Sequence, residues 1–215
     1  MIKIKRLVNA WYNVSLVLAV VSALIAIFFM EDTIQKILWA SIAFLFLHFF
    51  EEFGFPGGFP WMGMRVLMGS KEKDSTKWNC NNLNSMFGNW SFLILVYALP
   101  LVLRDVHFLL LAAMLFSLME LIVHLVLFNV KQRTIYNPGL VTAVFGLAPL
   151  AIYYFVNVFD KNFYVWSDYI FAVAWCVVVF WFSFRSPLYW GLGKLKGYKL
   201  TAQSAYGIRY AHNFR

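Results

Sequence analysis

Charged side chains are scarce in this chain: Asp, Glu, Lys and Arg together make up 13% of its 215 residues. A typical soluble domain carries about 25% charged residues and about 45–50% apolar ones. Here 62% of the residues are hydrophobic and 20% are aromatic. A soluble globular protein needs more polar surface than this, so the composition indicates a protein whose solvent is lipid.

Cysteine is almost absent as well. The chain has two cysteines, Cys80 in a polar stretch and Cys176 inside an apolar run, and it has no CxxC pattern. This spacing supports neither a disulfide framework nor a cysteine-ligated metal site, so we expect two free thiols.

Acidic residues are missing from the C-terminal part of the chain, since none follows Asp168. The formal net charge is +8, and in a membrane protein such an excess usually lies in cytoplasmic loops and against anionic headgroups. The tail over residues 185–215 combines basic residues with Leu, Tyr and Trp, which favours a place in the headgroup layer. No fold signature of nucleic-acid binding is present, so the expected partners are membrane lipids and not nucleic acid.

Long apolar runs, by contrast, are abundant. Six of them could cross a bilayer, which takes roughly 20 mostly apolar residues per helix, and they cover about 11–30, 33–53, 89–103, 106–130, 140–159 and 164–184. The third run is short, and an earlier start near Asn84 is an alternative. The first is too long for a signal-peptide core and no small-x-small cleavage site follows it, so we expect a retained helix. The sequence predicts one all-α domain over residues 1–215, a polytopic membrane protein with about six transmembrane helices. It does not indicate an oligomeric state.

Lys and Arg fall unevenly on the two sides of this arrangement. Of 18 such residues, 15 lie on the side of the N-terminus and the tail, whereas the other side holds Lys36, Arg104 and Lys161. The positive-inside rule therefore puts both termini in the cytoplasm, in what we expect to be a bacterial cytoplasmic membrane. On that side, residues 54–70 are rich in Gly and Pro and predict an interfacial or re-entrant segment, followed by a cytoplasmic loop at 71–88.

A few ionisable residues lie inside the predicted helices and form a pattern. Glu51, Glu52 and Glu120 are accompanied by His48 and His124. A carboxylate at the bilayer centre costs roughly 2.5–3.5 kcal/mol on insertion scales, and such residues are functional by default. His48 shares a helix face with the two carboxylates that follow it, and Glu120 and His124 have i,i+4 spacing. Both groups fall in the cytoplasmic third of the membrane, so we expect one shared site, without knowing which of the adjacent glutamates faces it.

Two asparagines are further candidates. Asn137 opens the fifth predicted helix from the same side, and Asn13 lies at the cytoplasmic end of the first. Asn137 is expected either to orient an oxygen of a substrate or to start the helix, because Asn-Pro-Gly also suits a turn. Asn13 is interpreted mainly as a structural polar residue.

These residue types suit two kinds of chemistry. In the first, a membrane-embedded enzyme acts on a lipidic or hydrophobic-peptide substrate, with Glu52 as base, Glu120 as acid and Asn137 orienting an oxygen. In the second, a divalent metal, zinc or iron, is bound by His48, Glu52, Glu120 and His124. The Glu-x-x-His pattern of di-iron bundles is absent, since this chain has His-x-x-Glu and Glu-x-x-x-His instead. Hydrolysis and isomerisation both stay open.

Two non-catalytic functions fit the same residues. Intramembrane Glu and His chains serve as proton relays, so a small proton-coupled carrier is one alternative. Against it, the polar residues reach only one side, and no ionisable residue in the outer half completes a path. The other alternative is an immunity or partner-binding membrane protein in which the polar cluster only holds helices together.

Taken together, the motifs resemble a known family. Three stretches are similar to those that recur in the HXXEE-domain proteins, small bacterial integral membrane proteins: His48-x-x-Glu51-Glu52, Glu120-x-x-x-His124 and Tyr136-Asn137-Pro138-Gly139. The resemblance runs over roughly Ile34 to Tyr154 and implies a polytopic protein with a suspected, unassigned enzymatic site. A weaker similarity links the adjacent glutamates to CAAX-type intramembrane proteases, whose Glu-Glu-x-x-x-Arg pattern is broken here by Pro56.

Overall fold

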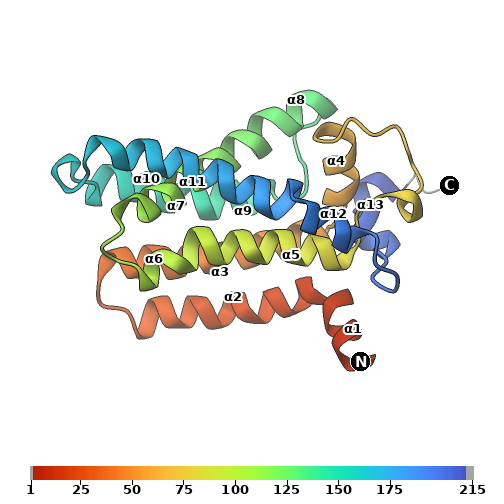
Figure 1. The fold of residues 1–215 in the computed structure, drawn as a ribbon, viewed down its shortest axis with the longest axis horizontal. Helices are drawn as coiled ribbons and strands as arrows, with labels where there is room; N and C mark the ends of the chain where they lie inside the picture. Colours follow the sequence, from red (N-terminus) through yellow and green to blue (C-terminus); the bar gives the residue numbers. More distant parts are fainter. Residues whose placement is uncertain (1, 212–215) are drawn as a thin grey trace.

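A computed structural model describes residues 2–211, and within that range it contains helices and no strands. Figure 1 shows long helices running side by side. The α-helices are α1 (Ile2–Asn9), α2 (Trp11–Phe28), α3 (Thr33–Phe53), α4 (Phe59–Val66), α5 (Asn82–Phe92), α6 (Leu99–Val102), α7 (His107–Ile122), α8 (Asn129–Gln132), α9 (Leu140–Thr142), α10 (Ala148–Tyr153), α11 (Trp166–Arg185), α12 (Pro187–Gly193) and α13 (Ala202–Tyr210).

The prediction of an all-α protein with six membrane-spanning helices is confirmed. Six continuous helical stretches are long and apolar enough to cross a membrane: Trp11–Phe28, Thr33–Phe53, Asn82–Val102, His107–Gln132, Leu140–Val158 and Trp166–Gly193. The third begins at Asn82, close to the alternative start near Asn84 and before Asn89. The side chain of Asn81 accepts hydrogen bonds from the backbone N–H groups of Leu83 and Asn84 and so caps the helix. The loop expected at 71–88 is correspondingly shorter.

Several of these spans change from α-helix to π-helix partway along their length. The π-helical segments are Leu93–Ala98, Val123–Phe128, Ala143–Leu147 and Tyr154–Val158. Two of them end just before a proline, Pro100 or Pro149, whose ring and missing N–H disturb the regular α-helical ladder. The segment Val123–Phe128 has no such proline and lies at the candidate site, where π-helical turns are frequent in proteins.

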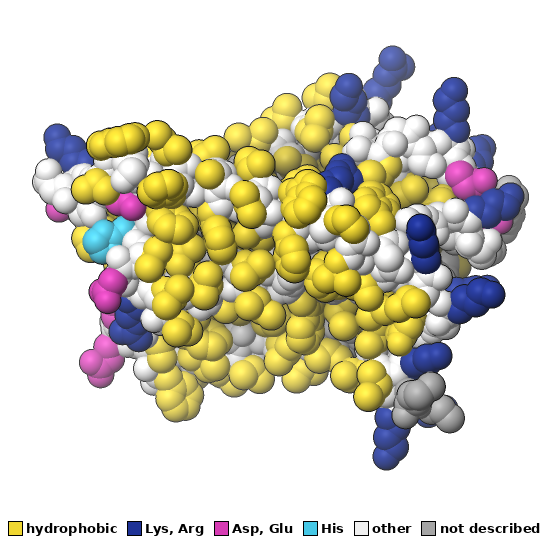
Figure 2. Space-filling view, viewed as in Figure 1, with side chains coloured by type: hydrophobic (Ala, Val, Ile, Leu, Met, Phe, Trp, Pro, Cys, Tyr) yellow, Lys and Arg dark blue, Asp and Glu magenta, His cyan; other side chains and the backbone are white. Residues whose placement is uncertain are grey.

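The two ends of the bundle differ in charge. In Figure 2 a broad apolar band separates two polar ends, and most of the visible Lys and Arg side chains stand at one of them. That end carries α1, α4, α12 and α13, so both ends of the described chain lie on the same side (Figure 1). The fold is that of an integral membrane protein, and the position of the chain ends agrees with an even number of spans.

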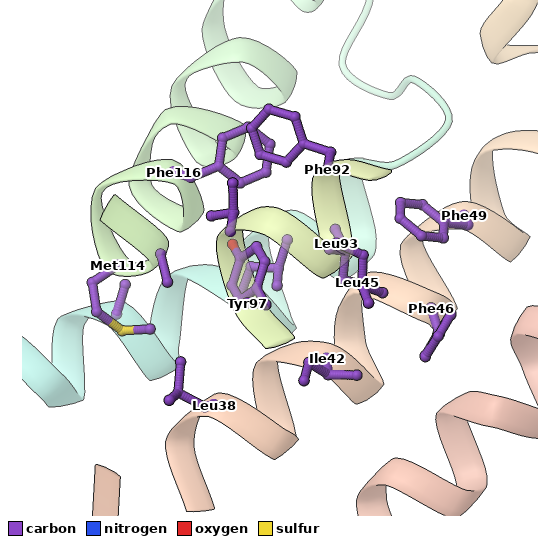
Figure 3. Close-up of a cluster of buried hydrophobic side chains, with 14 of the residues drawn as sticks. Leu38, Ile42, Leu45, Phe46, Phe49, Phe92, Leu93, Tyr97, Met114 and Phe116 are labelled. Atoms are coloured by element: carbon purple, nitrogen blue, oxygen red, sulfur yellow. The ribbon is translucent and has the colours of Figure 1, made fainter. Parts of the chain in front are cut away.

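The packed centre of the bundle lies between α3, α5 and α7. Leu38, Ile42 and Phe49 of α3 belong to one buried cluster with Phe92 at the end of α5 and Phe116 of α7, and Leu93 and Tyr97 lie between the two groups (Figure 3). The rings of Phe92 and Phe116 lie 4.1 Å apart between centroids. Because lipid tails are as apolar as these side chains, close van der Waals packing holds the helices together, not removal of apolar surface from water.

The Gly/Pro-rich segment after α3 is held by the C-terminal helix. Gly58 N–H donates to the carbonyl of Ser204 at 3.2 Å, and Ile208 N–H donates to the carbonyl of Pro56 at 3.2 Å. Gly57 and Gly58 have φ of +70° and +97°, and a Cβ on either would lie 2.6 Å from a backbone oxygen of α13. The basic tail, expected to lie against lipid, is therefore also packed into the fold through α13; residues 212–215 lie outside the described range.

The orientation in the membrane stays a prediction, and exposed loop residues test it. We expect cysteine introduced as Lys77→Cys to react with a membrane-impermeant maleimide only after cells are opened, and Lys161→Cys to react in intact cells. Both lysines are exposed, and they lie in loops on opposite sides of the bundle. The native Cys80 is a poor reporter, because burial raises the pKa of its thiol to about 11. The reverse labelling pattern would move the site to the outer face.

Candidate functional site

Four ionisable side chains from two helices meet inside the bundle. His48 and Glu52 come from α3, Glu120 comes from α7, and His124 comes from the π-helical segment that continues it. His48 Nε2 lies 3.4 Å from Glu52 Oε1 and 3.8 Å from Glu120 Oε2. His124 Nε2 lies 3.6 Å from Glu52 Oε1 and 3.3 Å from Glu120 Oε2. The side chains that the sequence predicts to lie together are therefore neighbours in the fold, and we call these four residues the His/Glu cluster.

The His/Glu cluster is shielded from its surroundings. The side chains of His48, Glu52 and His124 are 4%, 3% and 1% exposed, and that of Glu120 is 16% exposed. The two imidazole rings meet edge to face, with centroids 4.8 Å apart. The i,i+4 spacing on each helix directs a histidine and a glutamate to the same face, so two helices suffice to build the cluster.

Asn137 holds His124 in one orientation. Its side-chain Nδ2 donates to the carbonyl of His124 at 2.7 Å and to Asn129 Oδ1 at 2.8 Å. Its Oδ1 is then the acceptor that faces His124 Nδ1 at 2.7 Å, so the ring proton is on Nδ1 and Nε2 points into the cluster. The sequence predicts that Asn137 either starts the fifth helix or orients a substrate oxygen. In the structure its amide positions the imidazole of His124.

Thr142 holds the ring of His48 in one orientation, as Asn137 holds that of His124. The Thr142 hydroxyl donates to Glu51 Oε2 at 2.6 Å, a shorter contact than the 3.2 Å to the carbonyl of Gly139. Because the only proton of the hydroxyl is donated to Glu51, the hydroxyl oxygen accepts a hydrogen bond from His48 Nδ1 at 2.9 Å. His48 therefore also carries its proton on Nδ1 and turns Nε2 toward the cluster.

Glu51 has a different role from its neighbour Glu52. Its carboxylate accepts hydrogen bonds from Val141 N–H at 3.1 Å, Thr142 N–H at 2.9 Å and Tyr136 Oη at 3.2 Å, besides the Thr142 hydroxyl. Burial and the adjacent carboxylate raise the pKa of Tyr136 well above its ordinary value, so the phenol keeps its proton and donates. Glu51 thus satisfies the free N–H groups at the start of the fifth span. Glu52 is the glutamate that faces the histidines.

Gly139 lets the loop before the fifth span approach both imidazoles. Its φ is +99°, and a Cβ there would lie 2.7 Å from His48 Cε1 and closer still to His124 Cε1. This explains the glycine of the Tyr-Asn-Pro-Gly stretch, because only a residue without Cβ fits both the backbone conformation and the space. Asn13, the other asparagine considered from the sequence, is exposed and contributes nothing to the cluster.

The His/Glu cluster opens onto a cavity of about 400 Å³. The remaining walls are mostly apolar and come from α3, α4, α5, α7, α11 and α12, with Phe53, Phe116 and Phe180 among them. Arg185, at the end of α11, also lines the cavity; its guanidinium contacts Met68 Sδ and lies 5.7 Å from the Phe180 ring centroid. The His/Glu cluster therefore forms a polar patch in the wall of a mostly apolar cavity.

Three supporting residues were not assigned a role from the sequence. Asn129, Thr142 and Arg185 lie outside the predicted cluster, and no spacing rule connects them to it. Thr142 and Tyr136 do belong to the recurring stretch around Tyr-Asn-Pro-Gly, which was a signal that the segment matters. Their hydrogen bonds to His48 and Glu51 could be found only from the fold.

Comparison with known proteins identifies the family. A family model described as "protein of unknown function with HXXEE motif" matches residues 39–154, more than half of the chain. The matched region contains the whole His/Glu cluster and its supporting residues Glu51, Asn137 and Thr142. No curated protein and no solved structure matches the chain. The chain therefore belongs to the family of proteins of unknown function that carry the HXXEE motif.

Proposed function

We propose that this protein is a membrane-embedded hydrolase that acts on a lipidic substrate near the cytoplasmic face of a bacterial cytoplasmic membrane. The observation that carries the proposal is the opening of the His/Glu cluster onto the apolar cavity. Two imidazoles and two carboxylates in a low-dielectric site are suited to proton transfer, and the cavity volume falls within the 300–1,000 Å³ typical of ligand sites.

The wall of the cavity suggests the shape of the substrate. Its aromatic and aliphatic lining suits an acyl or similar chain, and Arg185 supplies a positive charge. Among residues 2–211 no carboxylate forms an ion pair with Arg185. A half-buried guanidinium that contacts a sulfur and an aromatic ring but no carboxylate favours an amphiphile with an anionic group, such as a carboxylate or a phosphate.

The reaction that fits these groups is hydrolysis of an ester or amide. Water gives a proton to Glu52 as its oxygen bonds to the carbonyl carbon. The bond from that carbon to the leaving oxygen or nitrogen then breaks, and the leaving atom takes the proton from Glu52. Glu52 is the appropriate base because its carboxylate faces both histidines, whereas the oxygens of Glu51 are occupied by four donors.

Lipid analysis of matched cells tests this function. We expect cells that express Glu52→Gln to retain an amphiphile that cells with the wild-type protein convert, because loss of a general base typically lowers a rate about 10²–10⁴-fold. Glu72→Gln is the matched control, since Glu72 lies in the loop after α4, away from the cavity. The measurement is mass spectrometry of total lipid extracts and of lipid bound to the purified proteins. Identical lipid profiles for wild type and Glu52→Gln would contradict the proposal.

A further inference from the structure

We propose that His48 Nε2, His124 Nε2 and Glu120 Oε2 bind one divalent transition-metal ion, with Glu52 beside its open coordination position. The inference deepens the proposed function by naming the cofactor of the same site. The role of Glu52 as base rests on that function, whereas the metal site itself rests on the geometry of the cluster.

The first argument is the direction of the ring protons. Both histidines donate a hydrogen bond from Nδ1–H to a residue outside the cluster, His48 to Thr142 and His124 to Asn137. Both Nε2 lone pairs therefore point inward, where they meet the carboxylates of Glu52 and Glu120. These groups are all acceptors, and adjacent buried acceptors without a donor repel one another. A proton or a metal ion must therefore lie between them.

The second argument favours a metal ion over two extra protons. Protonating both rings would place two cations edge to face, with centroids 4.8 Å apart, away from water. One divalent ion satisfies both Nε2 atoms and a carboxylate while leaving the imidazoles neutral. Hydrogen bonds from Nδ1–H to an amide oxygen or hydroxyl are also the usual support of metal-binding histidines, because they fix the tautomer and the ring orientation.

The third argument is distance. In a tetrahedral site with bonds of about 2.0–2.1 Å, neighbouring ligand atoms lie roughly 3.3 Å apart. Glu120 Oε2 lies 3.3 Å from His124 Nε2 and 3.8 Å from His48 Nε2. The three ligand atoms all lie within 4.8 Å of one another, so an ion can enter with small side-chain movements. Two His and one Glu form the ligand set of many catalytic zinc sites, which keep the fourth position for water or substrate.

Metal analysis of the purified full-length protein tests the proposal. We expect the wild type, prepared without chelator, to retain about one zinc per chain, and we expect His124→Gln and Glu120→Gln to retain tenfold less or none. Glu52→Gln should keep its metal, because Glu52 is not among the three ligands. His107→Gln is the matched control, since His107 stacks on Phe163, away from the cluster. Size-exclusion chromatography in detergent checks that each variant is folded.

Cobalt substitution keeps the test decisive if the ligand variants fold poorly. Wild-type protein stripped with chelator and loaded with Co²⁺ should show the visible absorption of a tetrahedral site. Wild-type protein that neither retains a metal nor takes up Zn²⁺ or Co²⁺ would overturn the proposal. Loss of metal in Glu52→Gln would contradict the part of it in which Glu52 lies beside an open coordination position and is not a ligand. Retained metal together with identical lipid profiles for wild type and Glu52→Gln would support the metal site while contradicting hydrolysis, so the failures of the two proposals are distinguishable.

Discussion

Glu51→Ala is expected to destabilise the protein strongly, whereas Glu52→Gln should leave its melting temperature close to that of wild type. Glu51 is 7% exposed, and its carboxylate accepts hydrogen bonds from two backbone N–H groups and two hydroxyls. Each buried polar group left without a partner costs about 1–3 kcal/mol. Losing this acceptor should therefore lower the free energy of unfolding by at least about 3 kcal/mol, or about 6–12 °C in melting temperature for a chain of this length.

Thermal unfolding in detergent measures this difference. Glu51→Gln should recover part of the loss, because its amide keeps one acceptor oxygen but turns an NH₂ group toward donors. Glu52→Gln is the matched control, since it changes the adjacent residue on the same helix in the same chemical way. Equal melting temperatures for Glu51→Ala and wild type would show that Glu51 does not hold the start of the fifth span.

Gly139→Ala is expected to disrupt the His/Glu cluster. The new methyl group would lie 2.7 Å from His48 Cε1 and closer to His124 Cε1, so both rings must move. The rings are held by Thr142 and Asn137, which leaves little room for adjustment. A residue with Cβ at positive φ costs about 1–2 kcal/mol, and forcing extra volume into a packed site typically adds about 1–3 kcal/mol. We expect loss of lipid turnover and of bound metal.

Gly69→Ala separates the steric effect from the backbone effect. Gly69 also has a positive φ, +62°, but a Cβ there would meet no atom within 4 Å. The Gly69→Ala variant should therefore lose only the stability that a residue with Cβ costs at positive φ, and it should keep its metal and its activity. Melting temperature and metal content of the two variants, measured side by side, check this expectation. Full activity and full metal content in Gly139→Ala would mean that the imidazoles are not held as described.

The sequence alone determined the architecture of this protein. A bilayer requires long apolar runs and leaves few places for charge. Counting these runs predicts the spans and, because their number is even, chain ends on the same side. The few ionisable residues inside the runs can be recognised in the same way. Regular i,i+3 and i,i+4 spacing then placed His48 with the glutamates after it and Glu120 with His124. The apolar run marks the third span only from Asn89, whereas the helix begins at Asn82, because capping by Asn81 is a local hydrogen-bonding effect inside a polar stretch.

Only the tertiary structure decided what each residue of the site does. The sequence could not show which of Glu51 and Glu52 faces the histidines. Adjacent residues on a helix point in different directions, and only the packing of neighbouring helices shows what lies in each direction. It could not show that Asn137 and Thr142 point both Nε2 atoms inward, since those hydrogen bonds join segments that are 13 and 94 residues apart. The cavity likewise exists only where several helices meet. Helical periodicity is a local property, whereas the positions of protons, charges and empty space depend on how distant segments pack.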